Sequence, residues 1–182
     1  VSVSEEACPM GLAPTASTTA ALAMGDALAV ALLQKRGFKE EDFAQFHPGG
    51  TLGRRLLLRV RDLMHHGEAV PRVARQASLR EAIVEMTAKK LGMTTVVESD
   101  GRLYGVITDG DLRRFLGKGA DVTATRAGDV ASRNPKVMPP HELAARAVQT
   151  MEQYSITSVV VEEEGRIVGV IHLHDLLKSG VV

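Results

Sequence analysis

An internal repeat constrains the fold of this 182-residue chain more than any other feature. Residues 105–112 read Gly-Val-Ile-Thr-Asp-Gly-Asp-Leu and align with residues 169–176, Gly-Val-Ile-His-Leu-His-Asp-Leu, 64 positions later. Upstream, residues 93–98 align with residues 156–161 at an offset of 63, so the copies differ by one residue in the turn that follows. A unit this small buries too little apolar surface alone, so we expect the two copies to pack face to face.

Each copy predicts the order helix, strand, tight turn, strand, helix. Ser78-Leu-Arg-Glu81 is a capping box that opens the first helix, and His141–Tyr154 is the counterpart of that helix in the second copy. The predicted strands over residues 94–98 and 103–108 are rich in β-branched residues and flank an Asp-Gly turn. The fold class of this part is therefore α+β, built twice.

The repeat resembles the cystathionine β-synthase (CBS) domain through Gly105-Val-Ile-Thr108-x-x-Asp111-Leu, with Thr94-Thr-Val-Val upstream. The resemblance covers about residues 60–180 and implies a tandem pair, a Bateman module, whose clefts can bind an adenosine-type nucleotide as an effector. It implies that Thr108, Asp111 and, in the second copy, Asp175 hold the phosphate and ribose hydroxyls of that ligand. The alternative is that the Asp111 carboxylate only caps the helix that follows it.

The second copy departs from this pattern, because His172 stands where the first copy has Thr108. A neutral imidazole is bulkier than a hydroxyl and would crowd the cleft, so we expect the stronger nucleotide site in the first copy. His172, His174 and Asp175 are too few groups for a metal site, and the sequence predicts neither a metal nor a cofactor.

The segment before the repeats contains an apolar helix. Ten of the twelve residues from Leu22 to Leu33 are apolar, Ser17 or Thr18 can cap the helix start, and Gly37 can end it. The apolar stretch is shorter than a bilayer span and carries an acid, so we expect a buried core helix and no membrane contact. Such a helix needs cover on nearly every side. One short strand over Val1–Ala7 is too little, so the cover is expected from elements outside this chain.

Residues 12–29, together with His47-Pro-Gly-Gly-Thr-Leu-Gly-Arg-Arg55, are similar to the end of the sugar isomerase (SIS) domain of arabinose 5-phosphate isomerases. A CBS pair after this segment is also that family's layout. The resemblance implies an α/β fold, the remnant of a doubly wound SIS domain at residues 1–55 followed by CBS repeats at residues 60–120 and 125–182. It implies a cytoplasmic homotetramer that interconverts D-ribulose 5-phosphate and D-arabinose 5-phosphate, its sugar-phosphate substrates, for Kdo and lipopolysaccharide biosynthesis.

His47 is the one catalytic residue of that family that can be carried over onto this chain. Isomerisation moves a proton between neighbouring carbons, and a histidine that titrates near neutral pH can donate or accept it. Pro48-Gly-Gly50 favours an extended backbone followed by a turn that can project the ring into a cleft. The alternative role for His47 is to cap a helix over Thr51–Leu58. Because the family's other catalytic residues are missing, we expect this chain alone to be inactive.

Composition excludes several other classes of function. Lysine plus arginine and aspartate plus glutamate number 22 each, and this zero net charge argues against nucleic-acid binding. Aromatic residues make up only 3% of the chain, which argues against a base-stacking platform. The single cysteine, Cys8, excludes an internal disulfide and is expected to be buried and inert. His65 and His66 are expected in a linker.

Two other functions remain open from the sequence. The chain can be a nucleotide-sensing module without catalysis, or an oligomerisation element in which the CBS pair only builds an assembly. The apolar helix favours the isomerase, because a free-standing CBS pair has no use for it.

Overall fold

The structure is a computed structural model that describes residues 1–39, 42, 50–117, 119 and 121–181, without the side chains of residues 51 and 52. His47, the candidate catalytic histidine, lies outside the described residues. The chain divides into two units, Val1–Phe46 and His47–Val182.

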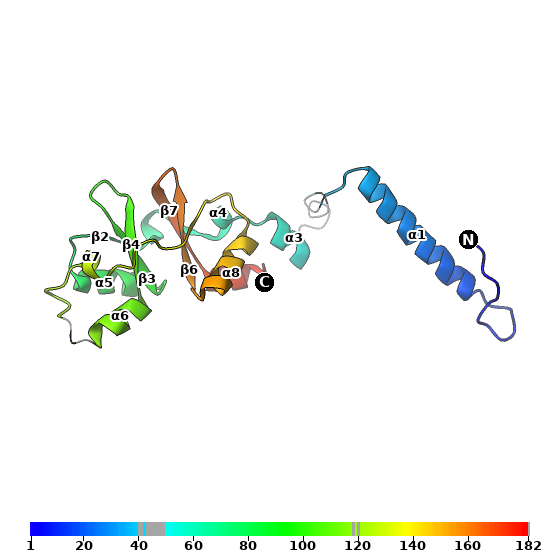
Figure 1. Cartoon of the computed structure of the whole chain (residues 1–182), viewed down its shortest axis with the longest axis horizontal. Helices are drawn as coiled ribbons and strands as arrows, with labels where there is room; N and C mark the ends of the chain where they lie inside the picture. Colours follow the sequence, from blue (N-terminus) through cyan, green and yellow to red (C-terminus); the bar gives the residue numbers. More distant parts are fainter. Residues whose placement is uncertain (40–41, 43–49, 118, 120, 182) are drawn as a thin grey trace. The chain divides into compact units, whose positions relative to one another are not determined.

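The first unit contains an N-terminal loop and helix α1 (Ala16–Lys35) (Figure 1). The predicted cap is wrong, because Thr15 rather than Ser17 or Thr18 is the N-cap, and its side chain makes no cap hydrogen bond. The Glu6 carboxylate instead accepts hydrogen bonds from the N–H groups of Thr15 and Ser17, at 2.7 and 3.3 Å. Hydrogen bonds from Ser17 and Thr15, the Ser17 side chain first, lower the pKa of Glu6 to about 2.

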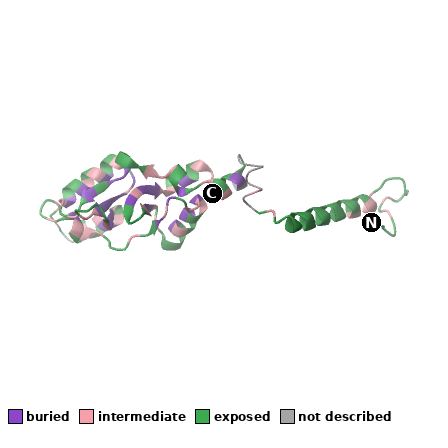
Figure 2. Cartoon of the chain, turned by 90° about the horizontal axis from the view of Figure 1, so that it is seen from above, coloured by how far each residue is buried: buried purple, intermediate pink, exposed green. Residues whose placement is uncertain are grey.

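Helix α1 has no buried residue within this chain (Figure 2). The strand expected over Val1–Ala7 does not form, so it does not cover any part of α1. Gly37 ends the helical segment with a φ of +63°, as predicted. The helix is also longer than the apolar stretch suggested, and by length and composition alone it could cross a membrane. The core helix of a soluble protein satisfies the same criterion.

Cys8 differs from its prediction. Its side chain is half-exposed rather than buried. Backbone N–H groups, those of Ala13, Met10 and Leu12 first, lower the pKa of the thiol by hydrogen bonding. Hydrogen bonds from loop amides stabilise the thiolate without any charged neighbour.

The second unit contains two copies of the predicted helix–strand–strand–helix unit, which lie side by side in Figure 1. The first copy has a three-stranded sheet in the order β2-β3-β4, in which β2 is parallel and β4 antiparallel to β3. Its elements are β2 (Arg72–Ala74), α5 (Leu79–Lys89), β3 (Met93–Val97), β4 (Leu103–Thr108), α6 (Asp109–Leu116) and α7 (Ala127–Val130).

The second copy has a four-stranded sheet in the order β1-β7-β6-β5, and its edge strand β1 comes from residues 65–66, which precede β2 of the first copy in the chain. His65 and His66 form this strand, and the prediction of a linker is wrong. Helix α8 begins three residues later than predicted. The elements are α3 (Thr51–Leu57), α4 (Val60–Leu63), β1 (His65–His66), the 3₁₀ turn η1 (Gly67–Ala69), β5 (Val137–Met138), α8 (Ala144–Tyr154), β6 (Ser158–Glu163), β7 (Arg166–His172) and α9 (Leu173–Ser179).

Capping boxes fix the helix starts of the first copy. The Ser78 hydroxyl accepts from the Glu81 N–H, and the Glu81 carboxylate accepts from the Ser78 N–H at 2.7 Å, as predicted. Thr108 and Asp111 form the same box at the start of α6. In α9 the position of Thr108 is taken by His172, whose Nδ1 accepts from the His174 N–H.

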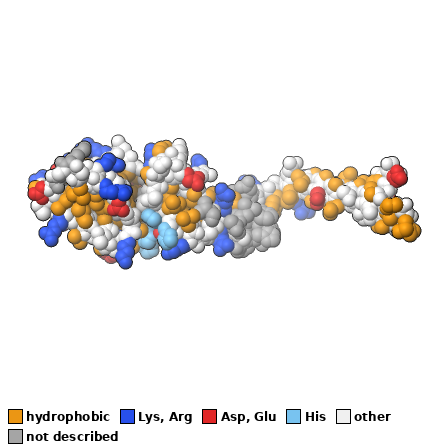
Figure 3. Space-filling view, turned by 90° about the horizontal axis from the view of Figure 1, so that it is seen from below, with side chains coloured by type: hydrophobic (Ala, Val, Ile, Leu, Met, Phe, Trp, Pro, Cys, Tyr) orange, Lys and Arg blue, Asp and Glu red, His pale blue; other side chains and the backbone are white. Residues whose placement is uncertain are grey.

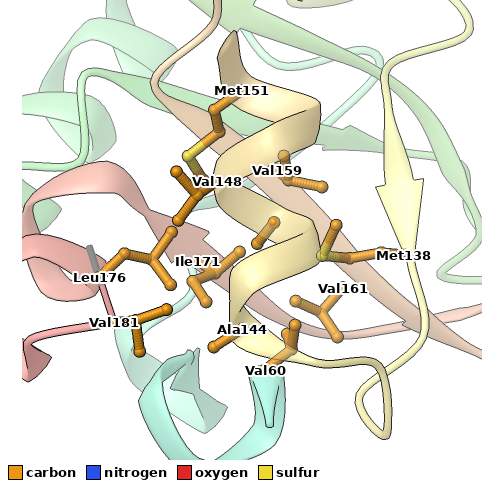
Figure 4. Packing of buried hydrophobic residues seen from close by; sticks show 11 residues of the cluster. Val60, Met138, Ala144, Val148, Met151, Val159, Val161, Ile171, Leu176 and Val181 are labelled. Atoms are coloured by element: carbon orange, nitrogen blue, oxygen red, sulfur yellow. The ribbon is translucent and has the colours of Figure 1, made fainter. Parts of the chain in front are cut away.

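Three apolar clusters hold the second unit together. One fills each copy, and Figure 4 shows the cluster of the second copy, in which Met151 and Val148 of α8 lie near Leu176 and Ile171. The third joins the two copies, and it confirms the predicted face-to-face packing. Its buried members are Val70, Leu91, Met93, Val106, Val160, Ile167 and Val170.

Candidate functional site

A cleft of about 700 Å³ lies between the two copies. Its apolar floor belongs to the cluster that joins the copies, and its rim is polar and charged. The lining comes from Gly92, Met93, Val106, the start of α6 from Thr108 to Asp111, Arg113, Arg114, residues 132–136, residues 154–158, Val160 and His172. An apolar floor beneath a few converging polar groups is typical of a small-molecule site.

Thr108 and Asp111, both predicted as ligand residues, line this cleft and form hydrogen bonds with each other. The Thr108 hydroxyl donates to Asp111 Oδ2 at 2.6 Å, and the Thr108 N–H donates to the same oxygen at 2.9 Å. Asp111 Oδ1 accepts from Arg114 Nη2 at 2.5 Å and from the Ser132 hydroxyl at 3.1 Å. Four donors therefore converge on one carboxylate, which is as many as its lone pairs accommodate.

The Asp111 carboxylate is held in its charged form. Burial raises its pKa, but the hydrogen bonds from Thr108, Arg114 and Ser132 together outweigh burial, and the net pKa lies below the ordinary value. Its side chain is only 9% exposed. The carboxylate thus offers a fixed negative charge deep in the cleft at neutral pH.

Asp175, the third predicted ligand residue, does not line this cleft. Its Oδ2 lies 2.8 Å from Nε2 of His65 on strand β1. A carboxylate only accepts, so His65 Nε2 is the donor. The arrangement mirrors the first copy: His65 is paired with Val170 across the sheet, and Ser132 is paired with the equivalent Val106. In each copy the carboxylate at the helix start therefore accepts a hydrogen bond from the segment that pairs with the preceding strand. The donor is the Ser132 hydroxyl for Asp111 and the His65 imidazole for Asp175.

We expect the His65–Asp175 hydrogen bond to contribute about 1 kcal/mol to the free energy of unfolding at pH 7. The two side chains are 34% and 28% exposed, so solvent only partly screens the interaction. Urea unfolding of His65→Gln, Asp175→Asn and the double variant measures this coupling. Strictly additive effects of the two substitutions would show that the contact carries no stability.

His172 also lines the cleft, and its pKa lies below the ordinary value. Burial lowers its pKa, the Asp175 charge raises it, and His174 and His65 lower it again, with a net downward shift. Its Nδ1 accepts a hydrogen bond from the His174 N–H at 3.1 Å, which needs an unprotonated Nδ1. Histidine side chains gather on one face of the unit (Figure 3).

This depressed pKa predicts a pH dependence of stability. The folded state binds the His172 proton more weakly than the unfolded state, so the contribution of His172 to stability is full above about pH 6.5. It is lost as the pH falls through 6.5 toward the folded-state value. We therefore expect wild type to lose more melting temperature than His172→Gln between pH 7.5 and about pH 5.5. Parallel losses in both proteins would contradict the shift.

Cationic side chains dominate the rim of the cleft. The cleft lining contains four cations and two carboxylates, and the Arg114–Asp111 ion pair removes one charge of each sign. They are Arg113, Arg114, Arg133 and Lys136, with Asp109 and Asp111. Two positive charges then remain in excess, although the whole chain has a net charge of zero. Lys136 Nζ lies 3.8 Å from the centroid of the Tyr154 ring, another lining residue. The cleft is suited to an anion with an apolar, planar part.

Three residues that hold the two carboxylates were not predicted from the sequence: Arg114, Ser132 and His65. The spacing of Asp111 and Arg114, three apart at a predicted helix start, is a signal for an ion pair on one helix face. No such signal exists for Ser132 or His65, because the antiparallel bridges that position them join residues far apart in the chain.

Known proteins resemble the chain in two ways. It is 51% identical over all 182 residues to arabinose 5-phosphate isomerase KdsD of Yersinia pestis and 53% identical to that of Escherichia coli K12. The chain spans 56% of the length of each relative. These relatives confirm the resemblance predicted from the sequence.

The solved structures that match are CBS proteins. One is a CBS-domain containing protein of Agrobacterium tumefaciens (TM-score 0.60, 26% identity, 66% of this chain and 92% of that chain). Another is a CBS domain protein of Pyrobaculum aerophilum complexed with AMP (TM-score 0.60, 21% identity, 69% and 100%). The CBS domain model matches residues 60–118 and 127–181, more than half of the chain. The chain therefore belongs to the CBS domain family, and its second unit is a tandem CBS pair.

Proposed function

We propose that this chain is the CBS-bearing part of an arabinose 5-phosphate isomerase. The observation that carries the proposal is the identity of 51–53% along all 182 residues, which includes the segment before the CBS pair. In this proposal residues 1–55 complete a SIS domain, and residues 60–120 and 125–182 are the two CBS domains. The uncovered apolar surface of α1 supports it, because such a helix needs the rest of a domain around it.

The proposed reaction is the interconversion of D-ribulose 5-phosphate and D-arabinose 5-phosphate, which serves Kdo and lipopolysaccharide biosynthesis in the cytoplasm. His47 is the proposed acid–base group, and the working enzyme is proposed to be a homotetramer. The test is an aldose–ketose exchange assay with ribulose 5-phosphate on the protein in its full length. Failure to form arabinose 5-phosphate would reject the proposal. The 182 residues alone are expected to give no turnover, because one histidine without a phosphate-binding site lacks the positioning that supplies much of the rate.

The CBS pair is proposed to bind a nucleotide effector in the cleft around Thr108 and Asp111. The support is the apolar floor, the excess positive charge of the rim and the buried, charged carboxylate of Asp111. The alternative, a CBS pair that only assembles subunits, predicts no nucleotide binding.

The two helix-start carboxylates should respond differently to substitution. We expect Asp111→Asn to weaken AMP binding about tenfold or more, the scale of a lost hydrogen bond to a charged group. Asp175→Asn should change it much less, since Asp175 lies outside the cleft lining and is bonded to His65. Calorimetry with AMP measures both, with melting curves as the control for folding. Equal losses, or a larger loss at Asp175, would contradict the expected asymmetry.

A further inference from the structure

The Asp111 carboxylate has no free position for a ligand. Both of its oxygens already accept two hydrogen bonds each, from Thr108 on one side and from Arg114 and Ser132 on the other. A ribose hydroxyl can therefore donate to Asp111 only if one of these donors leaves.

Arg114 is the donor that can leave at the lowest cost. The Thr108 donors belong to the helix cap, and Ser132 is fixed by backbone hydrogen bonds to Val106 at 2.8 and 3.0 Å. The Arg114 side chain is 72% exposed, and its ion pair with Asp111 is the only contact recorded for its guanidinium within the described residues. Because the guanidinium end of this pair is exposed, water can solvate Arg114 when it leaves Asp111, and this lowers the cost of breaking the pair.

A displaced Arg114 guanidinium stays in a position to act on the same ligand. It lines the cleft beside Arg113 on the same helix, and Arg133 and Lys136 lie on the same rim. Once it leaves Asp111, its charge is no longer neutralised, and the excess positive charge of the rim rises by one. Guanidinium groups bind phosphate with two parallel hydrogen bonds.

We propose that Arg114 determines the specificity of this cleft by exchange: it occupies the hydroxyl-binding position of Asp111 until a ribose hydroxyl displaces it, and then binds the ligand's phosphate. This inference rests on the proposed nucleotide site and names its ligand class, a 5′-phosphorylated ribonucleoside. An unphosphorylated nucleoside must break the same ion pair without gaining the phosphate contact. Arg114 therefore lowers the affinity of the cleft for the nucleoside and raises its affinity for the nucleotide.

The test is calorimetry of the 182-residue chain with AMP and with adenosine. Arg114→Gln is expected to weaken AMP binding about tenfold, the scale of a lost charged hydrogen bond. The same change is expected to leave adenosine binding unweakened or to tighten it, by up to about fivefold, since the competing ion pair is gone. Arg80→Gln, which removes an exposed arginine of α5 outside the cleft lining, is the matched control and should change neither affinity.

Arg114→Lys gives a second measurement if the glutamine variant folds poorly. It keeps a positive charge near the phosphate, so AMP should lose less affinity than in Arg114→Gln. Equal weakening of AMP and adenosine, or no change in either, would overturn the exchange and leave the nucleotide site in place. If wild type binds neither ligand, the proposed nucleotide site fails, and the exchange fails with it.

Discussion

Gly105→Ala is expected to lower the free energy of unfolding by about 2–3 kcal/mol, the cost of forcing an extra methyl group into a packed region. A Cβ at this position would lie 2.6 Å from the Ser132 carbonyl oxygen and 3.2 Å from the Ala131 Cβ. That oxygen accepts a hydrogen bond from the Val106 N–H at 3.0 Å, so neither backbone can move away without breaking the bridge. Urea unfolding followed by circular dichroism measures the loss.

Gly110→Ala is the matched control for this substitution. A Cβ at Gly110 would meet its nearest atoms, in Arg114 and Thr108, at 3.6 Å, which is ordinary van der Waals contact. We expect a change of less than about 1 kcal/mol in either direction. If Gly105→Ala lowered the free energy of unfolding no more than Gly110→Ala does, the predicted clash with the Ser132 backbone would be contradicted. The same crowding at the equivalent Gly169, 2.8 Å from the His65 carbonyl oxygen, explains why both repeats begin with glycine at this point.

Much of the fold could be predicted from the sequence because its signals are local. The capping box at Ser78–Glu81, the β-branched strands around Asp-Gly and the left-handed Gly37 each depend on a few neighbouring residues, and the structure confirms all three. The 64-residue repeat then predicted one long-range contact, the packing of the two copies against each other. Periodicity in a repeat makes a non-local contact visible in a single sequence.

The errors arose where a contact spans distant residues. At the start of α1 the Glu6 carboxylate takes the place of a side-chain cap, and it lies nine residues before Thr15 and eleven before Ser17. No local sequence pattern predicts such a contact. His65 pairs with Asp175 across 110 positions, because strand β1 is borrowed by the sheet of the second copy. In the candidate site, the motif predicted Thr108 and Asp111 as ligand residues, and both line the cleft between the copies. It could not predict that Arg114 and Ser132 saturate the carboxylate, which only the assembled geometry shows.

Replacement of His47 by alanine is expected to lower the turnover of the full-length isomerase by about 100-fold or more, the usual contribution of a general acid or base. Moving a proton between neighbouring carbons requires a group that changes protonation near neutral pH, and an unperturbed histidine does so at about 6.5. The melting temperature should change little, since the Pro48-Gly-Gly50 segment that follows His47 predicts a turn. His66→Ala, at an exposed histidine of strand β1, is the matched control and should keep full turnover. Near-normal turnover of His47→Ala, or an equal loss in the control, would remove His47 from the reaction. A loss of turnover that follows a loss of folded protein would instead assign His47 a structural role; the N-cap of the helix that begins at Thr51 is Gly50.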